Sequence, residues 1–154
     1  MTPAEIKQAL QLASSIVEKF EGLGLNPYLC PSGIPTIGYG STFYEDGRKV
    51  SMSDPAITKE RAQELMQNTL SGFCGSVLLR CPEIKSVALL AACTDLAYNI
   101  GVHSFRSSTV ARLIGEGDLA GLPAAFRMWV KANGKVLRGL ERRREAEIAL
   151  FHSV

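Results

Sequence analysis

The segment 84–100, IKSVALLAACTDLAYNI, constrains the fold more than any other part of the chain. Its apolar residues cover nearly the whole circumference of a helix, which is typical of a helix buried in a protein core. Its most apolar run, 87–100, contains Asp95 and Asn99 and is too short to cross a bilayer. A chain of 154 residues can bury such a helix without help from a metal or a disulfide. We therefore expect a buried central helix that ends at Gly101.

Two helices are predicted before this segment. The first begins at Thr2-Pro3-Ala4-Glu5, which combines a capping box with a proline in the first turn. Its apolar side chains fall on one face at helical spacing: Ile6, Leu10, Ala13, Ile16, Val17 and Phe20. The second is capped by Thr58 and stopped by Pro82, and it contains two glycines, Gly72 and Gly75, that could bend it.

Helices are also predicted after the central segment. A short one starts at Ser107, Ser108 or Thr109 and breaks at 115–117, and a second covers 118–130. A turn at Asn133-Gly134 precedes a last helix over 140–151. The inward stripe of this last helix contains Leu140, Arg144, Ile148 and Phe151.

Residues 28–50 have strand character and predict a small antiparallel sheet. The β-forming runs are 36–40 and 42–44, and Asp46-Gly47 is a hairpin turn before 48–50. We therefore predict the α+β class for a single domain, 1–154. In it, helix 1–21 packs with a helical C-terminal lobe (81–154), and a linking helix (58–80) joins that lobe to a β lobe (22–57).

Charge and cysteine content exclude some classes of function. Residues 1–100 carry 8 basic and 10 acidic side chains, whereas residues 101–154 carry 9 and 5. The excess of basic side chains in residues 101–154 suits an anionic partner. No basic run alternates with aromatic residues, however, as it would in a nucleic-acid site. The four cysteines contain no C-x-x-C pair, and neither histidine is near one of them in the sequence. We therefore expect no zinc and no cofactor, and free thiols in preference to a Cys74–Cys81 bridge.

The stretch Glu21–Gly40, EGLGLNPYLCPSGIPTIGYG, has the composition of a functional site. Five glycines and three prolines constrain the backbone around Glu21, Cys30 and Thr36. Glu21 is expected at the C-terminal edge of the first helix, where the helix dipole disfavours a negative charge and so favours a protonated carboxyl. Considered with that helix alone, Glu21 is an ordinary helix-end glutamate.

These three residues are spaced as Glu-x8-Cys-x5-Thr, and the stretch resembles the phage lysozyme family, the endolysins related to phage T4 lysozyme. That family has Glu-x8-(Asp or Cys)-x5-Thr. The similarity covers about 13–151. It continues through the hairpin GIPTIGYG (33–40), AYNIG (97–101), FRSST (105–109), Trp129 and GLERRRE (139–145). The resemblance implies a lysozyme-like fold with a small N-terminal β lobe, a long linking helix and a mainly helical C-terminal lobe.

The resemblance also implies a muramidase that hydrolyses the β-1,4 bond between N-acetylmuramic acid and N-acetylglucosamine in peptidoglycan. Glu21 would be the general acid, and Thr36 would hold a water molecule. Cys30 stands where many relatives have aspartate. Because a thiol has an ordinary pKa of about 8.5, we expect Cys30 to position water or to act as a weak base. A thiolate nucleophile and a buried small residue are its alternative roles.

Other residues take roles from the same resemblance. Arg143, with Arg144 as the second choice, matches an arginine that pairs with the catalytic glutamate and would favour its ionised form. The sequence leaves open whether this effect exceeds that of the helix end. Tyr39, Asn99 and Phe105 are expected to line the saccharide groove, although Asn99 could instead bond to backbone. Trp129 is assigned to packing and Asp95 to a structural role, and Ser41 replaces a family histidine.

The resemblance predicts an endolysin that lyses bacteria from within. We expect a monomer made in the host cytoplasm without a signal peptide or membrane anchor, with no stable membrane insertion and no nucleic-acid partner. A holin-type pore would give it access to the periplasmic wall. One alternative is a wall-binding protein on the same fold without turnover, favoured only by Cys30. Another is a glycosidase acting on chitin-like polymers.

Overall fold

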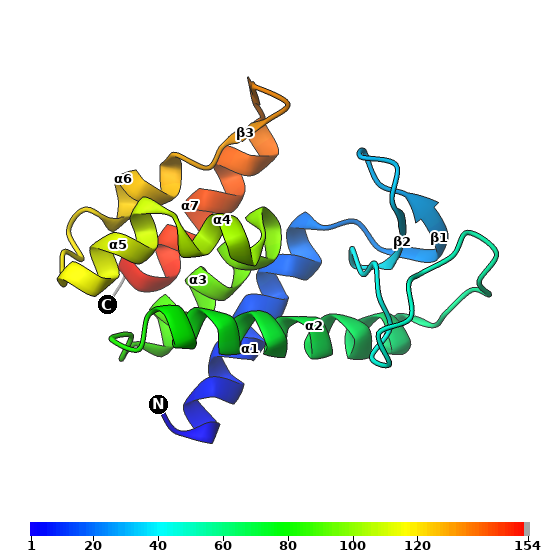
Figure 1. Cartoon of the computed structure of the whole chain (residues 1–154), viewed down its shortest axis with the longest axis horizontal. Helices are drawn as coiled ribbons and strands as arrows, with labels where there is room; N and C mark the ends of the chain where they lie inside the picture. The colour runs from blue at the N-terminus through cyan, green and yellow to red at the C-terminus, as the bar shows by residue number, and fades with distance from the viewer. Residues whose placement is uncertain (153–154) are drawn as a thin grey trace.

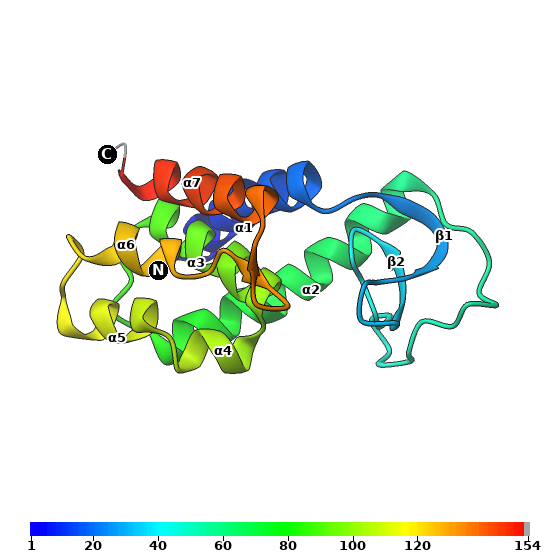
Figure 2. The ribbon, with the colours of Figure 1, turned by 90° about the horizontal axis from the view of Figure 1, so that it is seen from above.

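The computed structural model describes residues 1–152. It is α+β, with a larger helical lobe and a smaller β lobe joined by helix α2 (Lys59–Arg80). Figures 1 and 2 show α2 running along the molecule, with the strands β1 and β2 at one end and the shorter helices at the other. The fold predicted from the sequence is therefore confirmed. Within residues 1–152, no helix is both long enough and apolar enough to cross a membrane.

Helix α3 (Val87–Ile100) is the centre of the helical lobe, as its apolar sequence predicts. The hydroxyl of Ser86 caps it by accepting from the backbone N–H of Leu89 at 3.2 Å. Helices α1 (Pro3–Phe20), α2 and α7 (Arg138–His152) all pack against it. Every residue from Leu89 to Ala97 is buried, including Asp95. An acid in this position must be paired inside the protein, because burying an isolated charge is very costly.

Helix α1 (Pro3–Phe20) delivers Glu21 to the boundary between the two lobes. The predicted capping box is present, since Thr2 and Glu5 each accept the other's backbone N–H through a side-chain oxygen, at 3.1 and 2.8 Å. At the other end, the N–H of Glu21 bonds to the carbonyl of Val17 at 2.8 Å, and the backbone of Glu21 is already extended. The chain therefore leaves the helix at Glu21 and continues directly into the β lobe.

The β lobe contains the antiparallel strands β1 (Gly24–Leu29) and β2 (Pro35–Gly38). The first begins earlier than the predicted strand region, and a register shift lies between Gly24 and Tyr28. Tyr28 pairs with Thr36 across the sheet. Gly38 has φ of +67°, and a Cβ there would lie 3.2 Å from that of Ala62. This glycine lets β2 pack closely on α2.

The runs predicted as strands at 42–44 and 48–50 pair antiparallel around the predicted turn, but they do not form regular strands. Only isolated bridges occur there, Phe43 with Lys49 and Ile37 with Ser41, although the turn at Asp46-Gly47 is present. The N–H of Tyr44 donates to the carbonyl of Arg48, and the N–H of Val50 donates to that of Thr42, both at 2.9 Å. The Asp54 carboxylate accepts from the Tyr44 hydroxyl at 2.7 Å and from the N–H of Ser51 at 2.9 Å. These side-chain bonds add to the short backbone pairing and fix the loop beside it.

The remaining elements complete the helical lobe. Helix α2 passes through Gly72 and Gly75 as a single helix, and α4 (Val102–Arg106) was not predicted. Helix α6 is shorter than the predicted 118–130, because Pro123 fits only in the first turn of a helix. The other elements are α5 (Thr109–Glu116), α6 (Leu122–Arg127), β3 (Lys131–Ala132), β4 (Lys135–Val136) and α7 (Arg138–His152).

We predict that Leu90→Ala lowers the free energy of unfolding by about 2–5 kcal/mol, because it leaves a cavity around α3. Leu90 is fully buried, whereas Leu79 on α2 is 83% exposed. The control Leu79→Ala should therefore change the free energy by no more than about 0.5 kcal/mol. Urea unfolding measures both. Equal losses in the two variants would contradict the placement of the core around α3.

Candidate active site

Glu21, Cys30 and Thr36 line one cavity of about 540 Å³ at the start of the β lobe. Glu21 enters it from the end of α1, Cys30 from the end of β1 and Thr36 from β2. Its other lining residues are Gly22, Leu23, Gly24, Tyr28, Pro31, Gly40 and Thr42. The spacing Glu-x8-Cys-x5-Thr therefore brings a carboxyl, a thiol and a hydroxyl into a single space.

A tight turn between β1 and β2 sets the positions of the thiol and the hydroxyl. The N–H of Cys30 bonds to the carbonyl of Ile34 at 3.0 Å, and Gly33, with φ of +80°, closes the turn through the carbonyl of Cys30 at 2.8 Å. Thr36 is buried and donates its hydroxyl to the carbonyl of Ile34 at 2.8 Å. With its proton engaged in this way, the Thr36 oxygen remains an acceptor toward the cavity.

The Cys30 thiol is partly exposed and its environment favours the thiolate. Its sulfur lies 3.0 Å from the hydroxyl oxygen of Ser32. The Ser32 hydroxyl, followed by the backbone at Ile34, lowers the pKa of Cys30 to about 7. Hydrogen bonds to the sulfur produce this shift, and no cation is among its causes. A substantial fraction of Cys30 is thus ionised near neutral pH.

Arg143 on α7 holds the Glu21 carboxyl from inside the protein. Its Nη1 donates to Glu21 Oε1 at 2.8 Å, while Nε and Nη2 donate to the two oxygens of Asp95 at 2.9 and 2.7 Å. Arg144, the second choice, does not contact Glu21. It pairs with Glu147 at 2.8 Å and donates to the carbonyl of Trp129 at 3.1 Å. Neighbouring arginines on α7 therefore serve different partners.

The three residues expected along the saccharide groove differ in their accessibility. Phe105 is 1% exposed and packs in the core, so its side chain does not face solvent. The Tyr39 side chain is also buried, and its carbonyl accepts from the Tyr98 hydroxyl at 2.6 Å. Asn99 is partly exposed, and within the described chain its side chain makes no hydrogen bond. Of these three side chains, Asn99 is therefore the most accessible to a ligand.

Asp95 and Tyr28 belong to the site but were not predicted as part of it. Asp95 could have been found, because an acid on an apolar helix needs a buried partner. Tyr28 has no such signal, since only the strand register brings it across from Thr36. Burial, followed by the charge of Glu21, raises the pKa of both Tyr28 and Tyr98. Both phenols therefore stay neutral at neutral pH.

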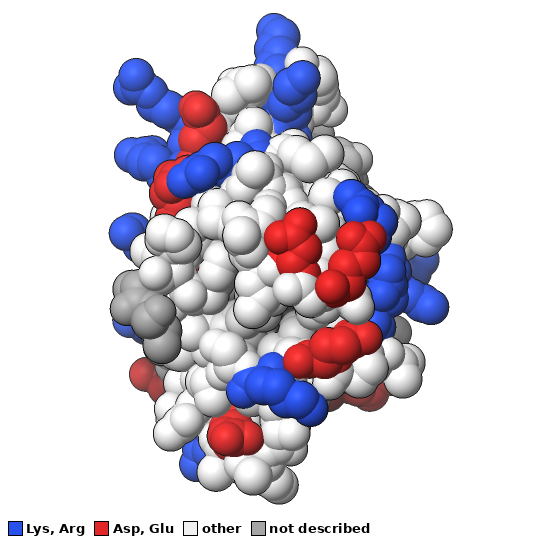
Figure 3. All heavy atoms as spheres, turned by 90° about the vertical axis from the view of Figure 1, so that its left-hand side faces the viewer, with Lys and Arg blue, Asp and Glu red and all other residues white. Residues whose placement is uncertain are grey.

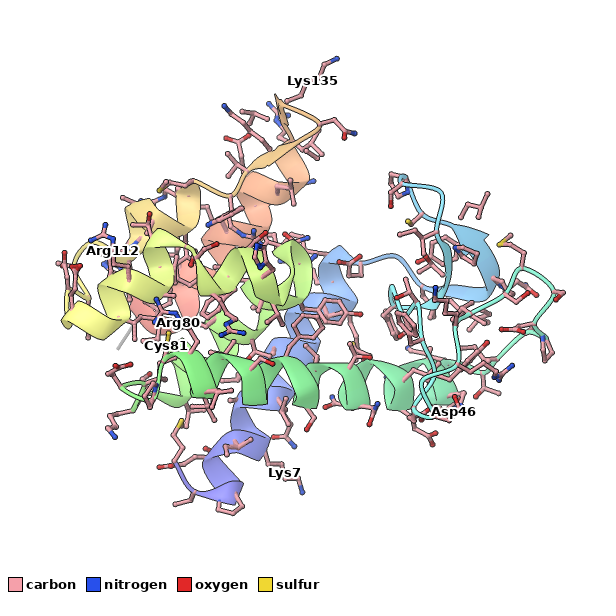
Figure 4. All side chains as sticks on the ribbon, in the orientation of Figure 1. Lys7, Asp46, Arg80, Cys81, Arg112 and Lys135 are labelled. Atoms are coloured by element: carbon pink, nitrogen blue, oxygen red, sulfur yellow. The ribbon has the colours of Figure 1, made fainter. Side chains whose placement is uncertain are left out.

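The other cysteines are distant from this chemistry. All four are free, and burial raises the pKa of Cys74, Cys81 and Cys93. Figure 4 shows Cys81 at the end of α2 that lies away from the β lobe. Among residues 1–152, no group of three or more His, Cys, Asp or Glu side chains could hold a metal ion.

A carboxyl at the end of the first helix, with a thiol and a hydroxyl of a small β lobe around the same cavity, is the arrangement of a lysozyme-like hydrolase. The particular family follows from comparison with known proteins. The chain belongs to the phage lysozyme family, whose model matches residues 18–147. It is therefore an enzyme of the lysozyme type.

Individual relatives agree with this assignment. The chain is 33% identical to an endolysin of Acyrthosiphon pisum secondary endosymbiont phage 1 over 142 residues, 90% of this chain and 93% of that one. It is 36% identical to an endolysin of Salmonella phage P22 over 149 residues, or 94% and 99% of the two chains. The solved endolysin from Escherichia coli O157:H7 phage FAHEc1 superposes with a TM-score of 0.81. It is 28% identical, and the match covers 94% of this chain and 93% of that one.

We predict that iodoacetamide labels Cys30 first in the folded protein, at a rate that rises as the pH passes through about 7. The thiolate is the reactive form, and the other three thiols are buried with raised pKa values. Mass spectrometry of the labelled protein measures the rate at each site. Cys30→Ser is the control and should leave the folded chain almost unlabelled. Labelling of Cys74 as fast as Cys30 would contradict the description of the site.

Proposed function

We propose that the chain hydrolyses the β-1,4 bond between N-acetylmuramic acid and N-acetylglucosamine in peptidoglycan, with Glu21 as the general acid. The main support is the position of its carboxyl group. One oxygen, Oε1, is fixed by Arg143, while the side chain stays 29% exposed in the cavity. Gly40 lies beside the other oxygen, and a Cβ there would be in van der Waals contact with Oε2, at 3.6 Å. A glycine there leaves that oxygen accessible to a substrate.

The reaction follows from the groups around the cavity. Glu21 donates its proton to the glycosidic oxygen as the bond to the anomeric carbon breaks, which leaves an oxocarbenium-like centre. Thr36 accepts a hydrogen bond from a water molecule, and Cys30 in its thiolate form accepts a proton from that water as it attacks. The alternative, in which the thiolate attacks the anomeric carbon and gives retention, uses the same residues. We favour the role of Cys30 in holding water.

Asn99 is our candidate for binding the sugar, since its side-chain amide is partly exposed and the described chain offers it no partner. An N-acetyl group or a hydroxyl would supply one. The buried side chains of Phe105 and Tyr39 are left out of this subsite. Their contribution to the groove is the packing that supports it.

We further propose that the protein acts as a monomer on the periplasmic wall after release from the host cytoplasm through a holin-type pore. The endolysin names of its relatives support lysis as the outcome. Basic side chains also suit an anionic wall, and Figure 3 shows several of them at the upper end of the helical lobe, with acidic ones among them. The alternative, wall binding without turnover, is favoured by one observation, the thiol of Cys30 in the place of a carboxylate.

We predict that Glu21→Gln lowers hydrolysis of purified peptidoglycan at least about 100-fold, because the amide keeps the shape of the side chain but has no acidic proton to give. The measurement is mass spectrometry of released fragments, which should end in a reducing N-acetylmuramic acid. Glu18→Gln, one turn earlier on α1, is the matched control and should keep full activity.

Two results would overturn the proposal. Turnover by Glu21→Gln close to that of the wild type would remove Glu21 as the acid. Wall binding by the wild type without release of fragments would favour the binding protein over the enzyme.

A further inference from the structure

We propose that Asp95 is a positioning residue for Glu21. By binding and neutralising the Arg143 guanidinium, it lets that arginine fix the glutamate without forcing it into the ionised form. This inference rests on the proposed function, in which Glu21 must hold a proton before it can donate one.

The geometry makes Asp95 the main partner of Arg143. Asp95 is fully buried and takes two hydrogen bonds from the guanidinium, at 2.9 and 2.7 Å, in the fork arrangement that arginine and carboxylate prefer. Glu21 receives a single bond from the remaining Nη1 and is partly exposed to solvent. The negative charge of Asp95 thus balances the positive charge of Arg143. The hydrogen bond from Arg143 Nη1 to Glu21 then serves to orient the Glu21 carboxyl.

A second buried pair lies behind the first. Arg144 and Glu147 are both fully buried and are paired at 2.8 Å. Burial, followed by a hydrogen bond with Asp95, raises the pKa of Glu147, against the opposing effect of Arg144. Two arginines therefore share the interior with two buried carboxyls. Without Asp95, the nearest carboxylate to the Arg143 cation would be Glu21 itself.

Other charged and titratable groups face Glu21, and they bear on any test by pH. Tyr98 reaches it from α3 and Tyr28 from β1, and the raised pKa of each phenol keeps both neutral below pH 8. Cys30, which follows β1, ionises near pH 7. Neither Asp95 nor Arg143 is among the groups that shift the pKa of Cys30, so we expect its ionisation to be the same in the wild type and in every variant. A difference between their pH profiles therefore reports the Asp95–Arg143 pair.

The test compares pH–rate profiles of peptidoglycan hydrolysis. Asp95→Asn should move the alkaline limb to lower pH by about one unit, because an unbalanced cation beside a carboxyl favours its ionised form. Arg143→Gln should move it to higher pH, because Asp95 is then an unbalanced buried anion. The double variant lacks both charges and should return the limb close to the wild-type position. Glu145→Gln, which opens an exposed pair with Arg127, is the control and should leave the profile unchanged.

A second readout does not need activity. The ¹³C chemical shift of the Glu21 carboxyl, followed with pH, should show proton loss at lower pH in Asp95→Asn than in the wild type. If the wild type hydrolyses nothing, the proposed function fails, while this titration still decides the role of Asp95. If Asp95→Asn does not fold, the comparison is made between Arg143→Gln and the double variant Asp95→Asn/Arg143→Gln. The Glu21 carboxyl should then lose its proton at lower pH in the double variant, which lacks the buried anion.

A purely structural role for Asp95 predicts a different outcome. Asp95→Asn would then lower thermal stability and reduce the rate equally at every pH. An unmoved alkaline limb together with an unmoved carboxyl titration would overturn the inference.

Discussion

The buried guanidinium of Arg143 is the interaction on which the site depends. It joins α7 to Asp95 on α3 and to Glu21 at the end of α1, so three helices meet at one group. Breaking one side of such a buried pair is costly, because it leaves an uncompensated charge in the interior. The helical lobe therefore fixes the carboxyl firmly, while the cavity faces the β lobe. Rigid support on one side and access on the other are what a general acid needs.

The β lobe supplies the remaining chemistry through backbone geometry. The turn from Cys30 to Ile34 and the pairing of Tyr28 with Thr36 place a thiol and a hydroxyl opposite the helix end. Hydrogen bonds from Ser32 and from the backbone lower the pKa of the Cys30 thiol to about 7, and no cation contributes to this shift. A cysteine in the place of a carboxylate can thus carry a partial negative charge under the conditions in which an aspartate would carry a full one.

Features set by local rules were predictable from the sequence. The Thr2–Glu5 capping box, the Thr58 cap and the buried α3 follow from short-range patterns, and the spacing of Glu21, Cys30 and Thr36 indicated one site. Features set by long-range packing were not. The segment 42–50 keeps only a short antiparallel pairing where strands were predicted, and the burial of Phe105 depends on how α4 docks. Asp95 and Arg143 are 48 residues apart, so their pairing required the fold.

A crystal structure of Glu21→Gln with a bound peptidoglycan oligosaccharide would test the central claim most directly. The account predicts a glycosidic oxygen within hydrogen-bond distance, roughly 3 Å, of the side chain of residue 21, with a water molecule held at Thr36 on the opposite side of the sugar. A glycan bound in the groove with every glycosidic oxygen distant from that side chain would contradict it.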